Sequence, residues 1–199
     1  MRGSLVDLSQ HARPLPDPTV VDTNVVVAAM LVPAVRTDPV HALRAAAFFS
    51  DLLASNRRAI LTPTAYSELL HVSIRIRYQQ ELRLNRPAIH ARYGARISRW
   101  TDLFKRDPTI AQQHAADLSQ LRRRLIAANI VVADTNTFGP IRSGLPFDVE
   151  LVRLIGHYGL DTSDAAMLIE ADRLGVLDIV TMDEDPRRAH LDFNIYTWM

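Results

Sequence analysis

The chain has 199 residues, of which 48% are hydrophobic and 23% are charged, and its formal net charge is +1. This composition is typical of one soluble globular domain, and the length leaves room for an insertion. The chain contains no cysteine, which excludes disulfides and thiolate zinc sites. The longest apolar stretch, residues 25–35, is shorter than the roughly 18 to 20 residues that a membrane span needs. The N-terminus lacks the apolar block of a secretion signal, so we expect a cytoplasmic protein with no membrane partner.

The small net charge hides a partition along the chain. Residues 1–74 carry six Arg and six acids, residues 75–132 carry eleven Arg and Lys105 against four acids, and residues 133–199 carry five Arg against twelve acids. A polyanion-binding arm beside a metal-binding cluster of carboxylates would produce this pattern. Solvated Arg-rich helix faces with no partner would produce it as well, so both interpretations stay open.

The first half of the chain predicts two strands and two helices behind an extended lead. Residues 1–18 contain three alternating prolines and form the lead. Residues 19–22, TVVD, are a short apolar strand that ends at Asp22. Asp38-Pro39 is a helix start, residues 58–62 are a second strand, and Thr62-Pro63 starts the next helix.

The second half continues the alternation of helices and strands. We expect helices over residues 86–105, from Asp107-Pro108 onward, over 147–158 with Gly159 at the end, and over 161–174; we expect strands over 129–134, 177–181 and 193–198, the last at a sheet edge. This alternation predicts an α/β fold with a mainly parallel sheet. Ligands of such sheets bind outside the carboxyl ends of the strands.

Acidic side chains follow two of the predicted strands. Asp22 ends the first strand, and Asp183 and Asp185 follow the last core strand in the sequence VTMDED. Parallel strands that share a sheet can bring these acids together although they are far apart in the sequence. Taken singly, each is equally well explained as a loop acid in contact with water.

Two more acids lie near predicted helix starts. Glu68 is the sixth residue of the helix that Pro63 opens, beyond the first turn where a carboxylate caps a helix or offsets its dipole. Asp164 follows the N-cap Asp161 by three residues, and that position alone would explain it as a helix-dipole partner. Four acids gathered from these elements would repel one another unless a divalent cation lay among them, and all-oxygen ligation suits Mg²⁺ or Mn²⁺.

Three stretches together resemble the motifs of PIN-domain nucleases: VVDTNVVV at 20–27, TAYSELLHV at 64–72 and YGLDTSDAAMLIEADRLGVLDIVTMDED at 158–185. The resemblance covers residues 19–77 and about 129–196. It implies a three-layer α/β/α sandwich with a central parallel sheet, and a ribonuclease activity that depends on Mg²⁺ or Mn²⁺. It also implies a frequent role as the toxin of a bacterial type II toxin–antitoxin pair.

The residues of the family motif can be carried over position by position. The resemblance implies catalytic, metal-binding acids at Asp22, Glu68, Asp164 and Asp183, and supporting residues at Asn24, Thr181 and Asp185. A second Asp-Thr-Asn tripeptide places Asp134 at a strand end that supplies no catalytic acid in the family.

The chain departs from the family pattern over about residues 78–128, where it holds more sequence than a compact member carries. We therefore describe residues 19–199 as one PIN-like domain with a helical, Arg-rich insertion. Its roles stay open: it could clamp RNA, receive an antitoxin protein, or form the contact of a homodimer. The arginines that we assign most weakly to RNA are Arg75, Arg77 and Arg92.

Other assignments fit the residues less well. Phosphatases of the haloacid dehalogenase type and response-regulator receivers need a catalytic lysine, and the single lysine, Lys105, lies in a predicted helix end. The sequence holds no GxGxxG or GxxxxGK[ST] motif for nucleotides. Glu68 and His71 match the Glu-x-x-His spacing of di-iron bundles, but a second copy is missing. The alternative from another class is a catalytically silent module of the same fold that binds RNA or a partner protein.

Overall fold

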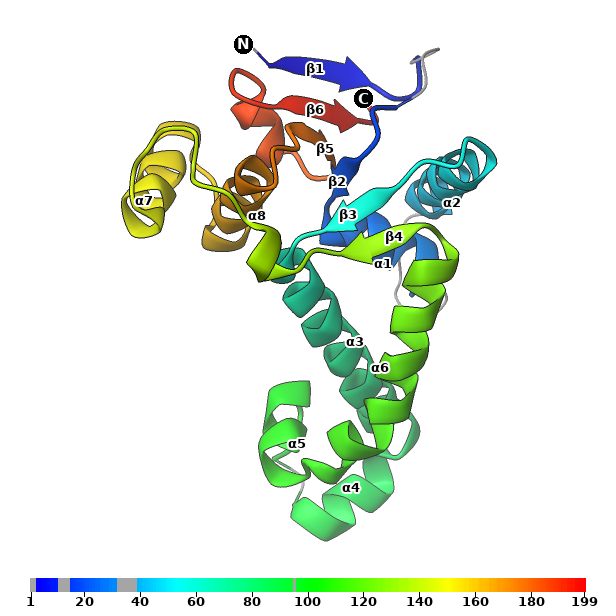
Figure 1. The fold of residues 1–199 in the computed structure, drawn as a ribbon. Helices are drawn as coiled ribbons and strands as arrows, with labels where there is room; N and C mark the ends of the chain where they lie inside the picture. The colour runs from blue at the N-terminus through cyan, green and yellow to red at the C-terminus, as the bar shows by residue number, and fades with distance from the viewer. Residues whose placement is uncertain (1–2, 11–14, 32–38, 95) are drawn as a thin grey trace.

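The computed structural model describes residues 3–10, 15–31, 39–94 and 96–199. A central sheet of six parallel strands has the order β1-β6-β5-β2-β3-β4. The strands are β1 (Ser4–Asp7), β2 (Thr19–Val21), β3 (Ala59–Leu61), β4 (Ile130–Val132), β5 (Asp178–Val180) and β6 (Asn194–Thr197). The described residues form eight α-helices around this sheet (Figure 1). The predicted α/β class with a parallel sheet is confirmed.

Helices lie between most of the parallel strands along the chain, and right-handed crossovers are the rule for such connections. The helices are α1 (Thr23–Met30), α2 (Pro39–Ala54), α3 (Pro63–Leu84), α4 (Arg86–Tyr93), α5 (Trp100–Arg106), α6 (Thr109–Ala127), α7 (Phe147–Tyr158) and α8 (Thr162–Arg173). The chain moves from β2 to β3 in one direction along the sheet and from β4 to β5 in the other. Crossovers of one hand then place α1 and α2 on one face and α7 and α8 on the opposite face (Figure 1).

The middle of the sheet is the best-buried part of the molecule. Val20 and Val21 of β2 and Ile179 and Val180 of β5 are fully buried, and the two strands pair with each other. Each strand is only three residues long, so the chain leaves the sheet within one residue of the core. Polar side chains that follow these strands are therefore held by the most rigid part of the fold.

The segment from the second half of α3 to α6 forms a helical arm. The second half of α3 leads away from the sheet, α4 and α5 pack at its far end, and α6 returns to β4 (Figure 1). The arm has its own apolar core, formed by Tyr78, Ile89, Ile97, Leu103 and Ile110. The Tyr78 hydroxyl donates to the carbonyl of Asp107 at 2.7 Å and ties α3 to the start of α6. The arm is thus a packed unit that continues from the sheet domain through α3.

Five local expectations differ from the structure. Within the predicted extended lead, residues 4–7 form strand β1. The last strand, β6, is not at an edge, because β1 pairs with it on the outer side. Residues 23–30, for which we predicted no element, form α1. The helix expected over residues 86–105 is divided into α4 and α5, with Gly94 between them at a φ of 92°. The helix expected from Asp107-Pro108 begins at Thr109, although the Asp107 carboxylate still accepts from the Thr109 amide at 3.2 Å. The expected N-cap Asp38 lies outside the described residues.

Candidate metal and nuclease site

Asp22 lies where β2 gives way to α1, at the carboxyl end of the sheet. Its side chain is only 5% exposed, and its backbone N–H donates to the carbonyl of Val180 on the neighbouring strand β5. The hydroxyl of Thr181, the residue after β5, donates to the Asp22 carboxylate at 2.6 Å. The two central strands thus deliver a buried carboxylate and a hydroxyl that orients it.

Asn24 links Asp22 to a second acid. Its side-chain amide donates to the carboxylates of Asp22 and Asp183, in both cases at 2.7 Å. The Asn24 carbonyl oxygen accepts from the backbone N–H of Met182 at 3.1 Å, which fixes the orientation of the amide. The sheet therefore brings Asp22 and Asp183 to opposite sides of one amide nitrogen, as their positions at strand ends predicted.

The helix that carries Glu68 is fastened to its neighbours at its first turn. Thr62 caps α3 by accepting from the Ala65 amide at 3.2 Å, as predicted. The Thr23 hydroxyl of α1 donates to the Ala65 carbonyl at 3.0 Å. Glu170, a buried acid of α8, accepts from the amide and the hydroxyl of Thr64 at 3.0 and 2.8 Å. These contacts hold the start of α3 between α1 and α8, so Glu68 has a fixed base although its own side chain is exposed.

Asp164 lies in the first turn of α8. Asp161 caps this helix by accepting from the Asp164 amide at 2.8 Å, as the sequence predicted. The Asp164 side chain is half-buried, and the next residue, Ala165, is fully buried against the core. Asp164 therefore faces the group of acids instead of serving only as a partner of the helix dipole.

The four acids lie close enough to affect one another's pKa values, and we call them the four-acid cluster: Asp22, Glu68, Asp164 and Asp183. Burial raises the pKa of Asp22 to about 7. Repulsion by Asp183 and Glu68 also raises it, while the hydrogen bond from Thr181 lowers it. Burial also raises the pKa of Asp164 to about 8, with repulsion from Asp22, Asp161, Asp183 and Glu68. Within the described part of the chain, no Lys, Arg or His forms an ion pair with any of the four.

A cavity of about 470 Å³ lies beside this cluster. Its lining combines Thr64, Ser67, Glu68 and His71 of α3 with Ser163 of α8, the residue before Asp164. A cavity with hydroxyl groups, a carboxylate and an imidazole beside buried acids can receive a polar ligand such as a phosphodiester. His71 is exposed on α3, and its ring packs edge-on against Trp100.

The donor set of the cluster fits a hard divalent cation. Four carboxylates supply only oxygen ligands, which Mg²⁺ and Mn²⁺ prefer. Burial is the main cause of the raised pKa values of Asp22 and Asp164, and a cation would offset the repulsion that adds to it. Among residues 3–10, 15–31, 39–94 and 96–199, no three His, Asp or Glu side chains already stand close enough to enclose an ion. Exposed Glu68 and Asp183 are the members with room to change their side-chain conformation.

The remaining predicted residues have other partners. Asp185 forms an ion pair with Arg188 at 2.8 Å, and it is not hydrogen-bonded to the Asn24 network in the described structure. Asp134 accepts from the Asn136 amide at 2.9 Å and caps the short 3₁₀ helix η1 (Thr135–Thr137), so its tripeptide has an ordinary capping role. The second Asp-Thr-Asn is thus separated from the cluster by both place and partner.

Of the three arginines assigned weakly to RNA, two are engaged within the arm. Arg77 pairs with Glu81 at 3.4 Å. Arg92 lies 3.7 Å from the Asp107 carboxylate and stacks over the ring of Tyr93. Arg75 is half-buried and has no ion pair among the described residues. Of these three arginines, only Arg75 therefore has no ion-pair partner among the described residues.

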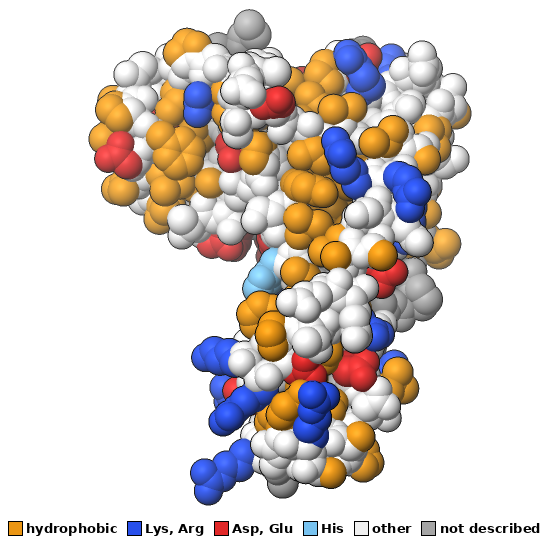
Figure 2. Space-filling view, turned by 60° about the horizontal axis from the view of Figure 1, so that its bottom comes forward, with side chains coloured by type: hydrophobic (Ala, Val, Ile, Leu, Met, Phe, Trp, Pro, Cys, Tyr) orange, Lys and Arg blue, Asp and Glu red, His pale blue; other side chains and the backbone are white. Residues whose placement is uncertain are grey.

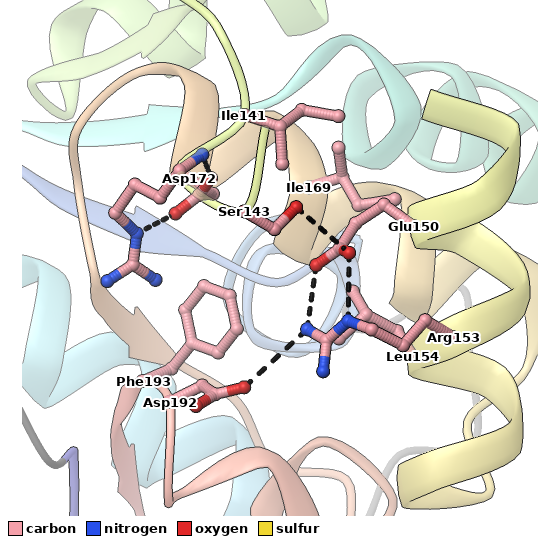
Figure 3. Close-up of a pocket in the computed structure, with 10 residues that line it drawn as sticks. Ile141, Ser143, Glu150, Arg153, Leu154, Ile169, Asp172, Asp192 and Phe193 are labelled. Atoms are coloured by element: carbon pink, nitrogen blue, oxygen red, sulfur yellow. Dashed lines mark hydrogen bonds and ion pairs between the residues drawn. The ribbon is translucent and has the colours of Figure 1, made fainter. Parts of the chain in front are cut away.

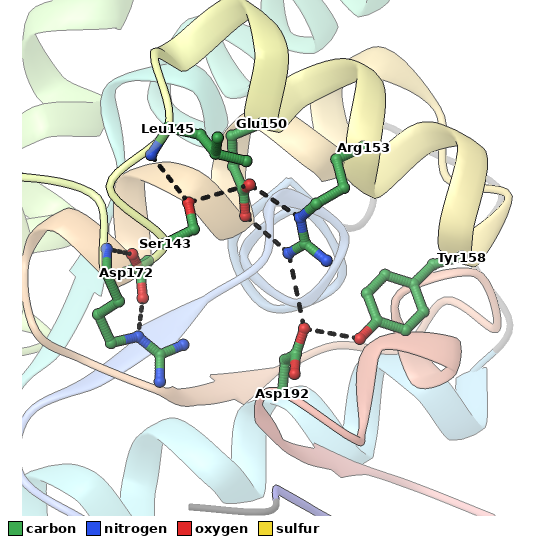
Figure 4. Close-up of polar contacts among 8 residues, drawn as sticks. Ser143, Leu145, Glu150, Arg153, Tyr158, Asp172 and Asp192 are labelled. Atoms are coloured by element: carbon green, nitrogen blue, oxygen red, sulfur yellow. Dashed lines mark hydrogen bonds and ion pairs between the residues drawn. The ribbon is translucent and has the colours of Figure 1, made fainter.

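A second polar group, which the sequence analysis did not identify, lines a cavity of about 430 Å³ between α7, α8 and the C-terminal segment (Figure 3). We call it the arginine-paired cluster: Arg142, Glu150, Arg153, Asp172 and Asp192. Both nitrogens of the Arg153 fork donate to Glu150, at 2.7 and 2.8 Å, and Arg153 also approaches Asp192 at 3.7 Å (Figure 4). Asp172 pairs with Arg142.

The pKa shifts of this second cluster run in the opposite direction. The Arg153 guanidinium lowers the pKa of buried Glu150, and Glu150 in turn raises the pKa of Arg153. Burial and the hydrogen bond to Asp192 raise the pKa of Tyr158 to about 12, so the phenol stays a donor. In the arginine-paired cluster each acid therefore has an arginine partner. Arg153 links α7 to the segment before β6, and Arg142 links the loop before α7 to α8.

Glu170 is the residue near the site that sequence reasoning missed. It lies on α8, one and a half turns beyond Asp164, and its only sequence signal is an acid within an apolar run, MLIEA.

No protein-family model and no curated protein matches this chain. In the described part of the chain, no helix is both long enough and apolar enough to cross a membrane.

Proposed function

We propose that this protein is a metal-dependent endoribonuclease of the PIN-domain type. One observation carries the proposal: four carboxylates from two strand ends and two helices lie within electrostatic reach of one another, and among the described residues no side-chain cation compensates them. A fold that only needed polar residues at this place would pair them, as the arginine-paired cluster does. Such an arrangement is instead expected where a divalent cation completes the site.

The residues of the proposed site have two roles: some would bind the cation, and others hold these ligands in position. Asp22, Glu68, Asp164 and Asp183 are the proposed ligands for Mg²⁺ or Mn²⁺. When bound, the cation supplies activation of a water molecule and stabilisation of negative charge on the phosphodiester oxygens. Asn24 and Thr181 keep the Asp22 carboxylate oriented, and the Glu170–Thr64 contact fixes the start of the helix that carries Glu68.

RNA is the proposed substrate, and the cavity beside Glu68 and Ser163 is the proposed place for the reacting phosphodiester. The resemblance further suggests a toxin that a partner antitoxin holds inactive. A small open reading frame directly upstream of the gene, whose product binds the protein and stops cleavage, would support that role. The absence of any inhibiting partner would leave a ribonuclease outside a toxin–antitoxin pair.

The experiment that tests the proposal is cleavage of single-stranded RNA by the purified protein. We expect cleavage with Mg²⁺ or Mn²⁺, loss of cleavage in chelator, and loss in Asp22→Asn and Asp164→Asn proteins that keep the circular dichroism spectrum of the wild type. The rival function is a catalytically silent RNA-binding or partner-binding module. Tight, salt-dependent RNA binding with no cleavage under any divalent cation would favour that module and contradict the nuclease.

A further inference from the structure

The helical arm carries a cavity that the proposed catalytic site does not use. It measures about 670 Å³ and lies between the end of α3, the start of α4 and the start of α5. The lining residues are Gln79, Leu82, Arg83, Arg86, Ser98, Arg99, Trp100 and Thr101. Among the described residues this lining includes three arginines, one large aromatic ring and no acid.

The charge of these arginines is not compensated within the described structure. Arg83, Arg86 and Arg99 are exposed and belong to none of its ion pairs. The nearest acids in sequence do not line the cavity: Glu81 pairs with Arg77, and Asp102 accepts from the backbone N–H of Arg99 but forms no ion pair with its guanidinium in the described structure. Three guanidinium groups around one hollow therefore create a positive field that an anionic ligand could neutralise.

Trp100 connects this cavity to the proposed active site. Its ring packs edge-on against His71 with centroids 5.4 Å apart, and His71 lines the cavity beside Glu68. The two cavities thus meet at one pair of rings. Figure 2 shows several Lys and Arg side chains, with a few acids among them, on the lower lobe that the arm forms, and Asp and Glu side chains on the underside of the sheet domain above it.

Helix α3 runs from the acids of the proposed active site to the arginines of the arm cavity. Glu68, His71, Arg75, Gln79 and Arg83 follow at spacings of three and four residues, which places them on one face of the helix. Fifteen residues separate the first from the last, or about 22 Å along the helix at 1.5 Å per residue. A ligand that reaches from the acids to the arginines must be an extended chain with repeated negative charge.

We propose that the arm cavity is a binding subsite for single-stranded RNA, in which Arg83, Arg86 and Arg99 contact phosphates and Trp100 stacks on a base beside the path to the metal site. Arginines that track the backbone together with an aromatic ring are the usual means of binding single strands without sequence preference. This inference rests on the proposed function for the identity of the polyanion. It adds the place where the strand is held away from the cut.

The first test compares two variants that remove the same charge from the arm. One carries Arg83→Gln, Arg86→Gln and Arg99→Gln; the control carries Arg106→Gln, Arg122→Gln and Arg123→Gln, which are exposed arginines outside the cavity and outside the ion pairs of the described structure. Binding of fluorescein-labelled oligouridylate is measured by anisotropy in chelator, so that no cleavage competes. Circular dichroism confirms that both variants are folded.

We expect at least tenfold weaker binding by the cavity variant and less than a threefold change in the control. The slope of log K against log salt should fall by about 2 for the cavity variant, because each phosphate contact on a single strand contributes about 0.7. An equal loss in both variants, or none in the cavity variant, overturns the inference.

The second test uses the tryptophans, of which the chain has two. In Trp198→Phe protein, Trp100 is the only indole, and bound oligouridylate should quench its fluorescence. In Trp100→Phe protein, the remaining Trp198 should show no change. Quenching of both tryptophans, or of neither, contradicts stacking on Trp100.

The outcomes separate this inference from the proposed function. If the wild type cleaves RNA and the cavity variant binds it normally, the inference alone fails. If the cavity variant loses RNA binding and the wild type never cleaves RNA, the nuclease proposal alone fails. Duplex DNA that binds equally tightly with the same dependence on the three arginines would overturn the assignment to single-stranded RNA.

Discussion

Two groups of carboxylates in the molecule each include a buried side chain, Glu150 in one and Asp22 in the other, and the partners of these two side chains differ. In the arginine-paired cluster, Glu150 is buried but receives two hydrogen bonds from Arg153, and its pKa is lowered. In the four-acid cluster, Asp22 is equally buried, but it accepts hydrogen bonds from the neutral side chains of Thr181 and Asn24, and its pKa is raised to about 7. Asp22 and Glu150 have the same exposed fraction, 5%, but burial is the main cause of the raised pKa of Asp22, whereas the hydrogen bonds from Arg153 outweigh burial at Glu150.

The difference separates a structural role from a chemical one. A carboxylate that is compensated by the protein's own arginine has no need of a ligand, and its removal is expected to affect stability. A group of carboxylates that repel one another is destabilising for the fold alone, and such groups persist mainly where they bind a ligand or react. The predictions below contrast the two clusters, starting with the largest expected effect.

The largest contrast should appear in activity. Asp22→Asn or Asp164→Asn should lower the rate of RNA cleavage about a thousandfold, because several kcal/mol of cation-dependent stabilisation corresponds to at least that factor. The matched control is Glu150→Gln in the arginine-paired cluster, whose activity per folded molecule should stay within about threefold of the wild type. Rates are measured with labelled RNA at saturating Mn²⁺. Equal losses from the two clusters would remove the distinction between them.

The reverse contrast should appear in stability. Arg153→Ala leaves Glu150 buried without its cation and should lower the free energy of unfolding by roughly 2 to 4 kcal/mol. Asp22→Asn in the same chelator-containing buffer should leave that free energy unchanged or raise it, since a repelling charge is removed. Urea denaturation measures both. A loss below about 0.5 kcal/mol for Arg153→Ala would mean that the pair contributes no more than an exposed ion pair does.

A smaller effect is expected from the residues that orient Asp22. Thr181→Val keeps the shape of the side chain but removes the hydroxyl that donates to Asp22 at 2.6 Å. Losing such a partner of a metal ligand typically lowers metal affinity or activity by about 10 to 100-fold. The apparent Mn²⁺ affinity in the cleavage assay should weaken by that factor. Unchanged affinity would show that the hydroxyl only satisfies the buried carboxylate.

The smallest contrast is in the pH dependence of stability without metal. Burial raises the pKa values of Asp22 and Asp164 to about 7 and about 8, from an ordinary value of 3.8. The folded state then binds more protons than the unfolded state between about pH 4 and 8, so these groups make stability fall as pH rises through that window. Asp22→Asn should flatten the slope.

Glu150 should act with the opposite sign. Its pKa is lowered from 4.5 by Arg153, so its contribution is present above that value and is lost as pH falls below it. Chemical denaturation in chelator at several pH values measures both effects. A stability that rises from pH 5 to 8 in the wild type, and equally in Asp22→Asn, would contradict the raised pKa of Asp22.

The fold was predictable where local signals and burial agree. Thr62-Pro63, Asp161 and Gly159 mark helix ends by cap chemistry that acts within one turn, and the structure has helix boundaries at all three. Helix α1 was missed because TNVVVAAM is an apolar, β-branched run that follows a strand, and only its packing against α2 and α3 makes it helical. Strand β1 was missed because SLVD is four residues long and owes its conformation to pairing with β6.

The site was predictable in part for a related reason. Asp22 and Asp183 each follow a strand, and a parallel sheet brings the carboxyl ends of its strands to one edge. Their positions in the sequence therefore predicted that they lie close together. The arginine-paired cluster had no such signal, because Glu150 and Asp192 are joined only by the packing of α7 against the C-terminal segment (Figure 4). Glu170 was hidden by its apolar neighbours, although a buried acid in such a run points to a hydrogen-bonded partner.

The central claim is that the four-acid cluster binds a divalent metal. A Mn²⁺ titration followed by electron paramagnetic resonance tests this claim most directly. We expect saturable Mn²⁺ binding by the wild type and by Glu150→Gln protein, and binding at least tenfold weaker in folded Asp22→Asn and Asp164→Asn proteins. Mg²⁺ should displace the bound Mn²⁺. If the wild type binds no Mn²⁺, or if both Asn variants bind it as tightly as the wild type, the cluster is not a metal site.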